Sequence, residues 1–324
     1  MELHTDVREQ YLDFAAYADG SPCLRDWALA VADDEELLAW LAGLPPLEQQ
    51  PNLVFAAARW HGVAAPGPYD GLRAALLADA GAIRGTISSR STQTNEVGRL
   101  ATLVPFLAEL GHDPVVLLEV GASAGLCLYP DRWSYEWHTA AGPVRAGEGP
   151  RLTCEVTGEL PATSVPGVAW RGGVDLNPLD VTDDDAMAWL ATLVWPEHEE
   201  RRARLRVGIE VARHDPPQLR RGDLLELLPE LVADAATHGP VVVFHTAVIA
   251  YLETDDRARF HQMMTELVAD GRCHWISNEG KRVLPEVTRT GPEVPEEMAT
   301  FVLGVDGRAR AWTHGHGASM TVLS

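Results

Sequence analysis

Apolar residues recur at three- and four-residue spacing over the first 110 residues of the chain, which predicts amphipathic helices. Glycines and prolines separate these periodic segments, and no strand is predicted before residue 114. A further helix is expected over about 95–110, with Thr94 as its N-cap and Gly111 as its C-terminal stop. The other expected helices span residues 7–17, 33–41, 53–60 and 72–77.

From residue 115 onward, short apolar runs alternate with helical segments. Runs rich in β-branched residues predict buried strands at 115–120, 241–244 and 273–276, with weaker ones at 168–170 and 218–219. Helical periodicity covers residues 183–194, 199–213, 224–236 and 255–269. Strands that alternate with helices predict a parallel sheet with right-handed crossover connections.

Two segments depart from this alternation. Residues 129–166 contain three alternating aromatic residues before a Gly- and Pro-rich stretch, and we interpret them as an inserted hairpin or flap around a strand at 151–156. Near the C-terminus, residues 300–305 and 308–312 flank the dipeptide Asp306-Gly307, which is typical of a tight antiparallel hairpin. Residues 318–323 could add to that edge.

These patterns predict an α/β fold with a Rossmann-like, mainly parallel sheet and an antiparallel C-terminal hairpin. Residues 1–110 would form a helical region, a lid on the substrate side. Residues 111–324 would form the sheet domain, with an insertion at about 129–166.

Charge and composition limit the kinds of partner that the protein is expected to bind. The formal net charge of −21 disfavours contact with nucleic acid or with anionic membranes. No apolar run approaches the roughly 20 residues of a membrane span, and the N-terminus lacks the apolar core of a signal peptide. Four widely spaced cysteines without a Cys-x-x-Cys pair fit a reduced, cytoplasmic protein. We therefore expect a cytoplasmic protein whose partner is a small molecule.

The most informative stretch follows the first predicted strand and runs from Glu119 to Leu126. A turn of small residues, Gly121-Ala122-Ser123-Ala124-Gly125, leads from the strand into an expected helix. Small residues allow a ligand to approach the backbone closely, and a helix N-terminus offers free N–H groups. This turn is therefore a candidate binding site for an anionic group.

The stretch resembles motif I of class I S-adenosylmethionine (SAM)-dependent methyltransferases. Three later segments fall in the order of that family: Gly173 to Pro178, Gly222-Asp223-Leu224 and Val241 to Thr246. The resemblance covers roughly residues 95–324. It implies that SAM is the cofactor and that its methyl group passes to a nitrogen or oxygen nucleophile of a small molecule, with no metal required.

The resemblance also implies roles for individual residues. Glu119 would receive the amino group of SAM, and Gly121, Ala122, Ser123 and Gly125 would line its methionine end. Asp175 and Asn177 would hold the ribose, and Asp223 and Leu224 the adenine. The chain departs from the family pattern at Ser123, which replaces a glycine, in the long gap before Asp175, and at His245-Thr246, where many N-methyltransferases carry an Asn/Asp-Pro-Pro-aromatic motif.

Several short sequence segments resemble more closely an uncharacterised bacterial family, domain of unknown function 2332. They are Gln93 to Val97, Glu119 to Leu126, Val174 to Asp180, Val194 to Glu197 and Val243 to His245. This resemblance spans nearly the whole chain and implies the methyltransferase-like fold, but it supplies no substrate.

Two alternatives stay open. Gly121-Ala122-Ser123-Ala124-Gly125 also matches Gly-x-Ser-x-Gly, the nucleophile elbow of α/β-hydrolases, with Asp223 or Asp255 and His314 or His316 as partners for Ser123. The helical first 110 residues and the adjacent Glu119 argue against it, since a hydrolase needs strands before the elbow. The second alternative is a non-catalytic protein that binds SAM or another nucleotide.

Polar residues at the ends of predicted strands indicate the reaction centre, because ligands of doubly wound sheets lie at the carboxyl ends of the strands. His245 ends one strand and would position the acceptor or act as a base, and Asn278 and Glu279 end another. Asn95 and Glu96, in a polar turn before the last N-terminal helix, would fold over the same mouth or act only as a helix cap.

Overall fold

The computed structural model describes residues 6–18 and 20–323. The chain divides into two compact units: residues up to Thr94 together with 184–203, and residues 95–183 together with 204–324. The expected domain boundary at residue 110 therefore differs from the observed division, because the helix that leads into the first strand belongs to the second unit.

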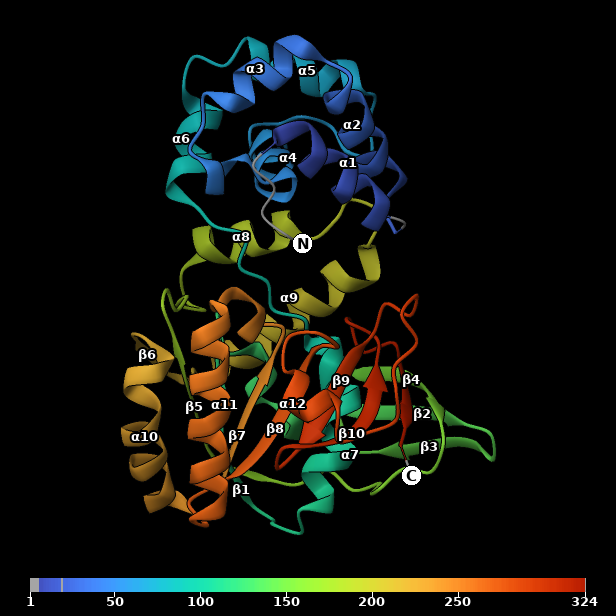
Figure 1. The fold of residues 1–324 in the computed structure, drawn as a ribbon, viewed down its shortest axis with the longest axis vertical. Helices are drawn as coiled ribbons and strands as arrows, with labels where there is room; N and C mark the ends of the chain where they lie inside the picture. The colour runs from blue at the N-terminus through green and yellow to red at the C-terminus, as the bar shows by residue number, and fades with distance from the viewer. Residues whose placement is uncertain (1–5, 19, 324) are drawn as a thin grey trace. The chain divides into compact units, whose positions relative to one another are not determined.

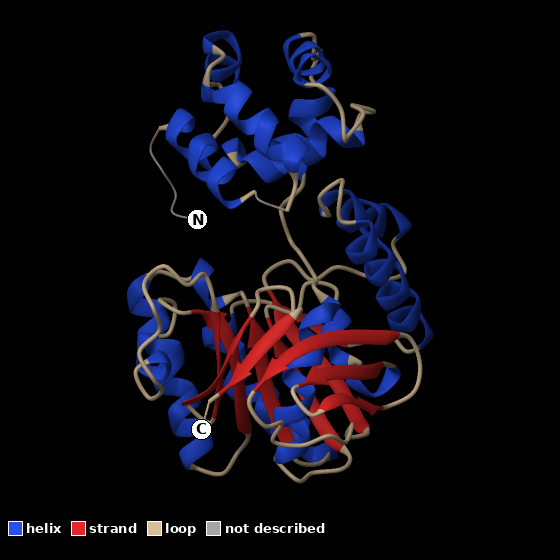
Figure 2. Ribbon diagram, turned by 90° about the vertical axis from the view of Figure 1, so that its right-hand side faces the viewer, coloured by secondary structure: helices blue, strands red, loops and turns tan. Residues whose placement is uncertain are grey.

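Helices build the described part of the first unit, which contains no strand (Figures 1 and 2). The first three helices are capped at their N-termini by Asp6, Ser21 and Asp34, whose side chains accept backbone N–H groups. Trp27 and Phe55 meet edge to face in the apolar core. The helices are α1 (Val7–Tyr17), α2 (Pro22–Ala32), α3 (Glu35–Ala42), α4 (Pro51–Trp60), α5 (Tyr69–Leu77), α6 (Ala82–Ser89), α8 (Asp184–Leu193) and the start of α9 (Glu199–His214).

The second unit is built on an eleven-stranded sheet with the order β3-β2-β4-β11-β10-β9-β8-β7-β1-β5-β6 among the described residues. Five neighbouring strands are parallel: β6 (Gln218–Arg221), β5 (Val168–Asp175), β1 (Val115–Val120), β7 (Val241–Thr246) and β8 (His274–Gly280). The order reverses at β1, because β5 and β6 lie on one side of it and β7 and β8 on the other. Ligands of doubly wound sheets bind at such a switch point.

The C-terminal strands confirm the expected antiparallel hairpin. Strand β9 (Phe301–Val305) pairs antiparallel with both β8 and β10 (Arg308–Thr313), and β11 (Ser319–Val322) follows. The insertion is not a separate flap. Its strands β2 (Ser134–Thr139), β3 (Gly142–Ala146) and β4 (Arg151–Thr157) extend the sheet, because β4 pairs with β11.

The two faces of the central strands carry different partners. Val116, Leu118 and Val120 of β1 pack with residues of α10 (Leu224–Ala235) and α11 (Thr254–Ala269), which lie against one face of the sheet (Figure 1). Helix α7 (Leu100–Glu109) is not part of that cluster and contacts β2, β4 and β8. Because successive side chains of a strand point to opposite faces, Glu119 points away from α10 and α11. We call the face of the sheet that packs against α10 and α11 the α10/α11 face, and the opposite face the α7 face.

Candidate functional site

The turn after β1 has a strained backbone. Gly121 and Gly125 have positive φ angles of 67° and 69°, and Ser123, a non-glycine residue, has a φ of 53°. Left-handed conformations at residues other than glycine are uncommon and cluster at functional sites. Ala247, in the turn after β7, has a φ of 56°. The two turns at the switch point thus both hold a residue in this region.

These two turns also touch. A Cβ atom built on Gly121 would lie 2.1 Å from Cγ2 of Val248, so only glycine fits at this position. The contact brings the end of β1 directly against the turn that follows β7.

Every backbone N–H from residue 121 to 126 is already hydrogen-bonded within the protein. Gly121 and Ala122 donate to the carbonyl of Val174, and Gly125 donates to that of Ala122. Ser123 donates to Oδ2 of Asp175 at 2.8 Å. Ala124 and Leu126 donate to Oδ1 of Asn95 at 3.0 and 3.4 Å. The turn is therefore held by two side chains, and its amides are not free to meet an anion.

The helix expected after Gly125 is not formed. The chain makes a short 3-10 turn, Leu126–Leu128, and a second one, Pro130–Arg132, before it enters β2. Without a following α-helix, this turn offers no helix N-terminus to a ligand. That part of the expected site is corrected by the structure.

Asn95 and Glu96 lie beside this turn. Besides accepting two amides, Asn95 donates through Nδ2 to the carbonyl of Ala122 at 3.2 Å. Glu96 caps the 3-10 turn Val97–Arg99 by accepting the N–H of Gly98, and its Oε1 lies 3.3 Å from Nη2 of Arg204. Glu96 rather than Thr94 is thus the cap of the segment that leads into α7. Both residues shape the candidate site.

His245 and Glu279 form a buried pair on the α10/α11 face. The indole N–H of Trp275 donates to Nε2 of His245 at 3.0 Å, so the proton of the neutral ring lies on Nδ1. Nδ1 donates to Oε1 of Glu279 at 2.7 Å, and this oxygen also accepts the N–H groups of Val248 and Ile249. His245 has no exposed surface. Both ring nitrogens are occupied, so we infer that the pair fixes the turn after β7.

The neighbouring residues of the same strands point the other way. Thr246 of β7 and Asn278 of β8 are partners in the sheet register and lie on the α7 face together with Glu119 of β1. The structure therefore separates the expected reaction centre: Asn278 lies on the face where Asn95 and Glu96 hold the turn, whereas His245 and Glu279 lie on the opposite face.

Arg99 is a site residue that the sequence did not single out. Its guanidinium is buried and donates to the carbonyl of Gly315 at 2.8 Å and to the carbonyl and hydroxyl oxygens of Thr246 at 3.1 and 3.0 Å. It thereby joins the end of β7 to the loop between β10 and β11. Its place in the polar segment that begins at Gln93 is the only sequence signal for it.

Glu119 is buried on the α7 face, and no hydrogen bond to its carboxyl group is present among the described residues. Burial raises the pKa of this carboxyl well above its usual value. The negative charge of Asp175 raises it further, and the positive charge of Arg99 acts in the opposite direction. An acid held in this way is a candidate ligand-binding group.

The expected ribose and adenine residues lie together at the ends of β5 and β6. Asp175 accepts the N–H of Asn177 at 2.7 Å in addition to that of Ser123, and the side chain of Asn177 accepts from Arg221. Asp223 caps α10 by accepting the N–H of Leu225, and Leu224 is the first residue of that helix. The structure thus brings Asp175, Asn177, Asp223 and Leu224 to one edge of the sheet.

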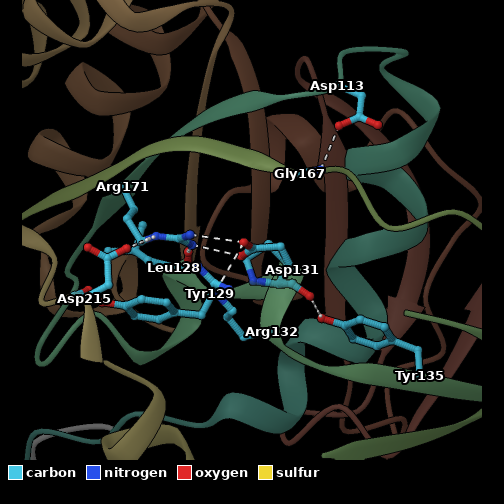
Figure 3. A network of polar contacts seen from close by, with 10 residues as sticks. Asp113, Leu128, Tyr129, Asp131, Arg132, Tyr135, Gly167, Arg171 and Asp215 are labelled. Carbon is cyan, nitrogen blue, oxygen red and sulfur yellow. Dashed lines mark hydrogen bonds and ion pairs between the residues drawn. The ribbon is translucent and has the colours of Figure 1, made fainter. Parts of the chain in front are cut away.

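A second polar network fixes the segment that follows the turn (Figure 3). Arg171 of β5 is buried, donates to the carbonyl of Leu128 at 2.8 Å and meets both carboxylate oxygens of Asp131. The hydroxyl of Tyr129 donates to the carbonyl of Asp215. Because a bidentate arginine–carboxylate pair is geometrically specific, this network holds the start of the insertion on β5.

A family model matches residues 8–321, and its members are described as uncharacterised proteins conserved in bacteria, DUF2332. The chain belongs to this family. No curated protein matches the sequence.

Within the part of the chain that the structure describes, this DUF2332 protein contains no helix that is long and apolar enough to cross a membrane. No group of three or more His, Cys, Asp and Glu side chains there could hold a metal ion. His314 and His316, the candidate partners of Ser123 in the hydrolase alternative, are linked by a hydrogen bond from the backbone N–H of His316 to Nδ1 of His314.

Proposed function

We propose that this DUF2332 protein binds SAM at the carboxyl edge of β6, β5, β1 and β7 and catalyses transfer of its methyl group to a nitrogen or oxygen nucleophile of a small molecule. The strand order carries the proposal: the order of five parallel strands reverses at β1, and an antiparallel strand, β9, lies beside β8. Acidic residues lie at or just after the ends of β1, β5 and β6 of this sheet, as the methyltransferase resemblance implies.

The residues present fit a nucleoside with a charged tail. Asp175 lies at the end of β5 and accepts backbone amides of the turn after β1 and of Asn177, and it is the acid that the methyltransferase resemblance places on the ribose hydroxyls. Leu176 follows it and is 71% exposed, which offers an apolar surface to a planar base. The unpaired carboxyl of Glu119 lies at the end of the adjacent strand β1.

SAM would supply an electrophilic methyl group on a sulfonium, which is already a good leaving group. The protein would then act chiefly by orienting the acceptor and excluding water. The occupied ring of His245 leaves proton removal to another group or to water, and Asn278 lies on the α7 face, where Glu119 also lies.

Calorimetry with SAM and S-adenosylhomocysteine tests the proposal. We expect Glu119→Gln, Asp175→Asn and Asp223→Asn each to weaken binding about 10- to 100-fold, because each removes a charge-assisted interaction. Glu266→Gln, at an exposed position of α11, is the matched control and should bind normally. If neither ligand binds the unaltered protein, the SAM proposal is wrong.

A serine hydrolase is the second candidate, favoured by the left-handed φ of Ser123 in its Gly-x-Ser-x-Gly turn. Against it, Oγ of Ser123 is buried without a hydrogen-bond partner in the described structure, so no histidine activates it there. Covalent labelling of Ser123 by a fluorophosphonate probe would favour the hydrolase over the methyltransferase.

A further inference from the structure

Three buried polar groups lie on the α7 face at the carboxyl ends of β1, β7 and β8. Glu119 is 3% exposed, Arg99 is 8% exposed and Asn278 has no exposed surface. Buried charges in proteins are normally paired with an opposite charge.

Arg99 contacts only neutral oxygen atoms within hydrogen-bond reach, namely two carbonyls and one hydroxyl. No carboxylate of the described residues forms an ion pair with it. A guanidinium carries five N–H donors. The three contacts of Arg99 use only Nε and Nη1, so donors remain for a further acceptor. A planar guanidinium is well suited to a carboxylate, which it can bind through two parallel hydrogen bonds.

Glu119 and Asn278 present complementary unused atoms. Oε2 of Glu119 and Nδ2 of Asn278 are inaccessible to solvent and have no partner within the described part of the chain, although Oδ1 of Asn278 accepts from Thr313 at 2.7 Å. Glu119 is in register with Phe244, two residues before Thr246, which binds Arg99. Glu119 and Thr246 are therefore diagonal neighbours on one face of the sheet, and Arg99 is bound to Thr246 beside the acid.

The turn after β1 cannot take the place of Arg99. All its N–H groups from residue 121 to 126 are bonded within the protein, and no α-helix follows it. An anionic ligand group at this mouth must therefore find another donor, and Arg99 is the buried cation beside Thr246 at the end of β7.

We infer that Arg99 and Glu119 together hold the zwitterionic end of an α-amino acid, with Arg99 on its carboxylate, Glu119 on its ammonium group and Nδ2 of Asn278 as an additional donor. This assignment rests on the proposed function for one source of that group, the methionine end of SAM. A free amino acid that serves as the acceptor has the same chemistry and is the other source.

A ligand series on the unaltered protein tests the assignment without any substitution. S-adenosylhomocysteine and its decarboxylated and deaminated analogues differ only in the charged groups, and 5′-methylthioadenosine lacks both charged groups together with the chain that carries them. We expect loss of either group to weaken binding about 10- to 100-fold in calorimetry, since each removes a charge-assisted hydrogen bond.

Variants then assign each group to its residue. In Arg99→Met, S-adenosylhomocysteine and its decarboxylated analogue should bind with equal affinity. In Glu119→Gln, S-adenosylhomocysteine and its deaminated analogue should bind with equal affinity. Affinity for 5′-methylthioadenosine should stay unchanged in both, which shows that the fold is intact. Arg99→Lys keeps the charge and should retain part of the discrimination. Arg259→Met and Glu266→Gln, exposed on α11, are matched controls.

The outcomes separate this inference from the proposed function. If the nucleosides bind but Arg99→Met and Glu119→Gln keep full discrimination, the inference is wrong and the SAM site stands. If no nucleoside binds, the proposed function is wrong, and L-amino acids are titrated against their decarboxylated amines. Binding of an amino acid that depends on Arg99 and Glu119 then supports the zwitterion site. Absence of that binding overturns it as well.

Discussion

At the scale of single residues, two buried acids on parallel strands of one sheet, Glu119 on β1 and Glu279 on β8, have different surroundings. Glu279 accepts three hydrogen bonds on Oε1, one of them from His245, while its Oε2 is buried without a hydrogen-bond partner among the described residues. Glu119 is equally buried but meets no donor among the described residues. A buried acid without donors destabilises the fold in its charged form, so its retention is better explained by a ligand than by stability.

The pKa of Glu119 gives a test in the ligand-free protein. Burial raises this pKa above its usual value of 4.5, so the folded state holds the proton more tightly than the unfolded chain. The stabilisation from this proton is complete below pH 4.5 and is lost as the pH rises through the folded-state pKa. Glu119→Gln lacks the titration. We expect the free energy of unfolding of the wild type, measured relative to Glu119→Gln by urea denaturation, to fall as the pH rises from 4.5. A difference that does not vary with pH would contradict this.

At the scale of elements, local pattern predicted most of the fold. Periodicity placed α10, α11 and the buried strands because their side chains face one continuous core. It missed the 3-10 turn after Gly125, because the segment is held by hydrogen bonds that its backbone N–H groups donate to the side chains of Asn95 and Asp175, which are distant in sequence. The period of two in β8 would have separated Asn278 from Glu279, since adjacent strand residues face opposite sides. Arg99 was missed because its partners, Thr246 and Gly315, are brought to it only by the fold.

The contact between the turns after β1 and β7 predicts a large cost for a methyl group at Gly121. Gly121→Ala combines a positive φ with a Cβ 2.1 Å from Val248, whereas Gly111→Ala has a similar φ of 74° and meets nothing within 4 Å. Backbone strain costs about 1–3 kcal/mol and overpacking about 1–3 kcal/mol more. We therefore expect Gly121→Ala to lower the free energy of unfolding by more than Gly111→Ala does. Equal losses would show that this contact adjusts freely.

At the scale of the whole molecule, the candidate site residues all belong to the second unit. Arg99, Glu119, Asp175, Asp223 and Asn278 all lie in residues 95–183 and 204–324. The first unit is discontinuous in sequence, since residues 184–203 add to it between β5 and β6. We therefore expect the cofactor, including its zwitterionic end, to bind to residues of the second unit alone.

Hydrogen–deuterium exchange with and without S-adenosylhomocysteine tests this division in the intact protein. A ligand that binds only the folded state suppresses local opening, by about 2.7 kcal/mol at 100 times its Kd. We expect slower exchange in the turns after β1, β5, β6 and β7, where the candidate ligand groups lie. The helices at residues 7–89 should exchange at an unchanged rate, because none of those groups belongs to them. Protection confined to these helices, with none in the turns, would place the ligand in the first unit and contradict the assignment of the site.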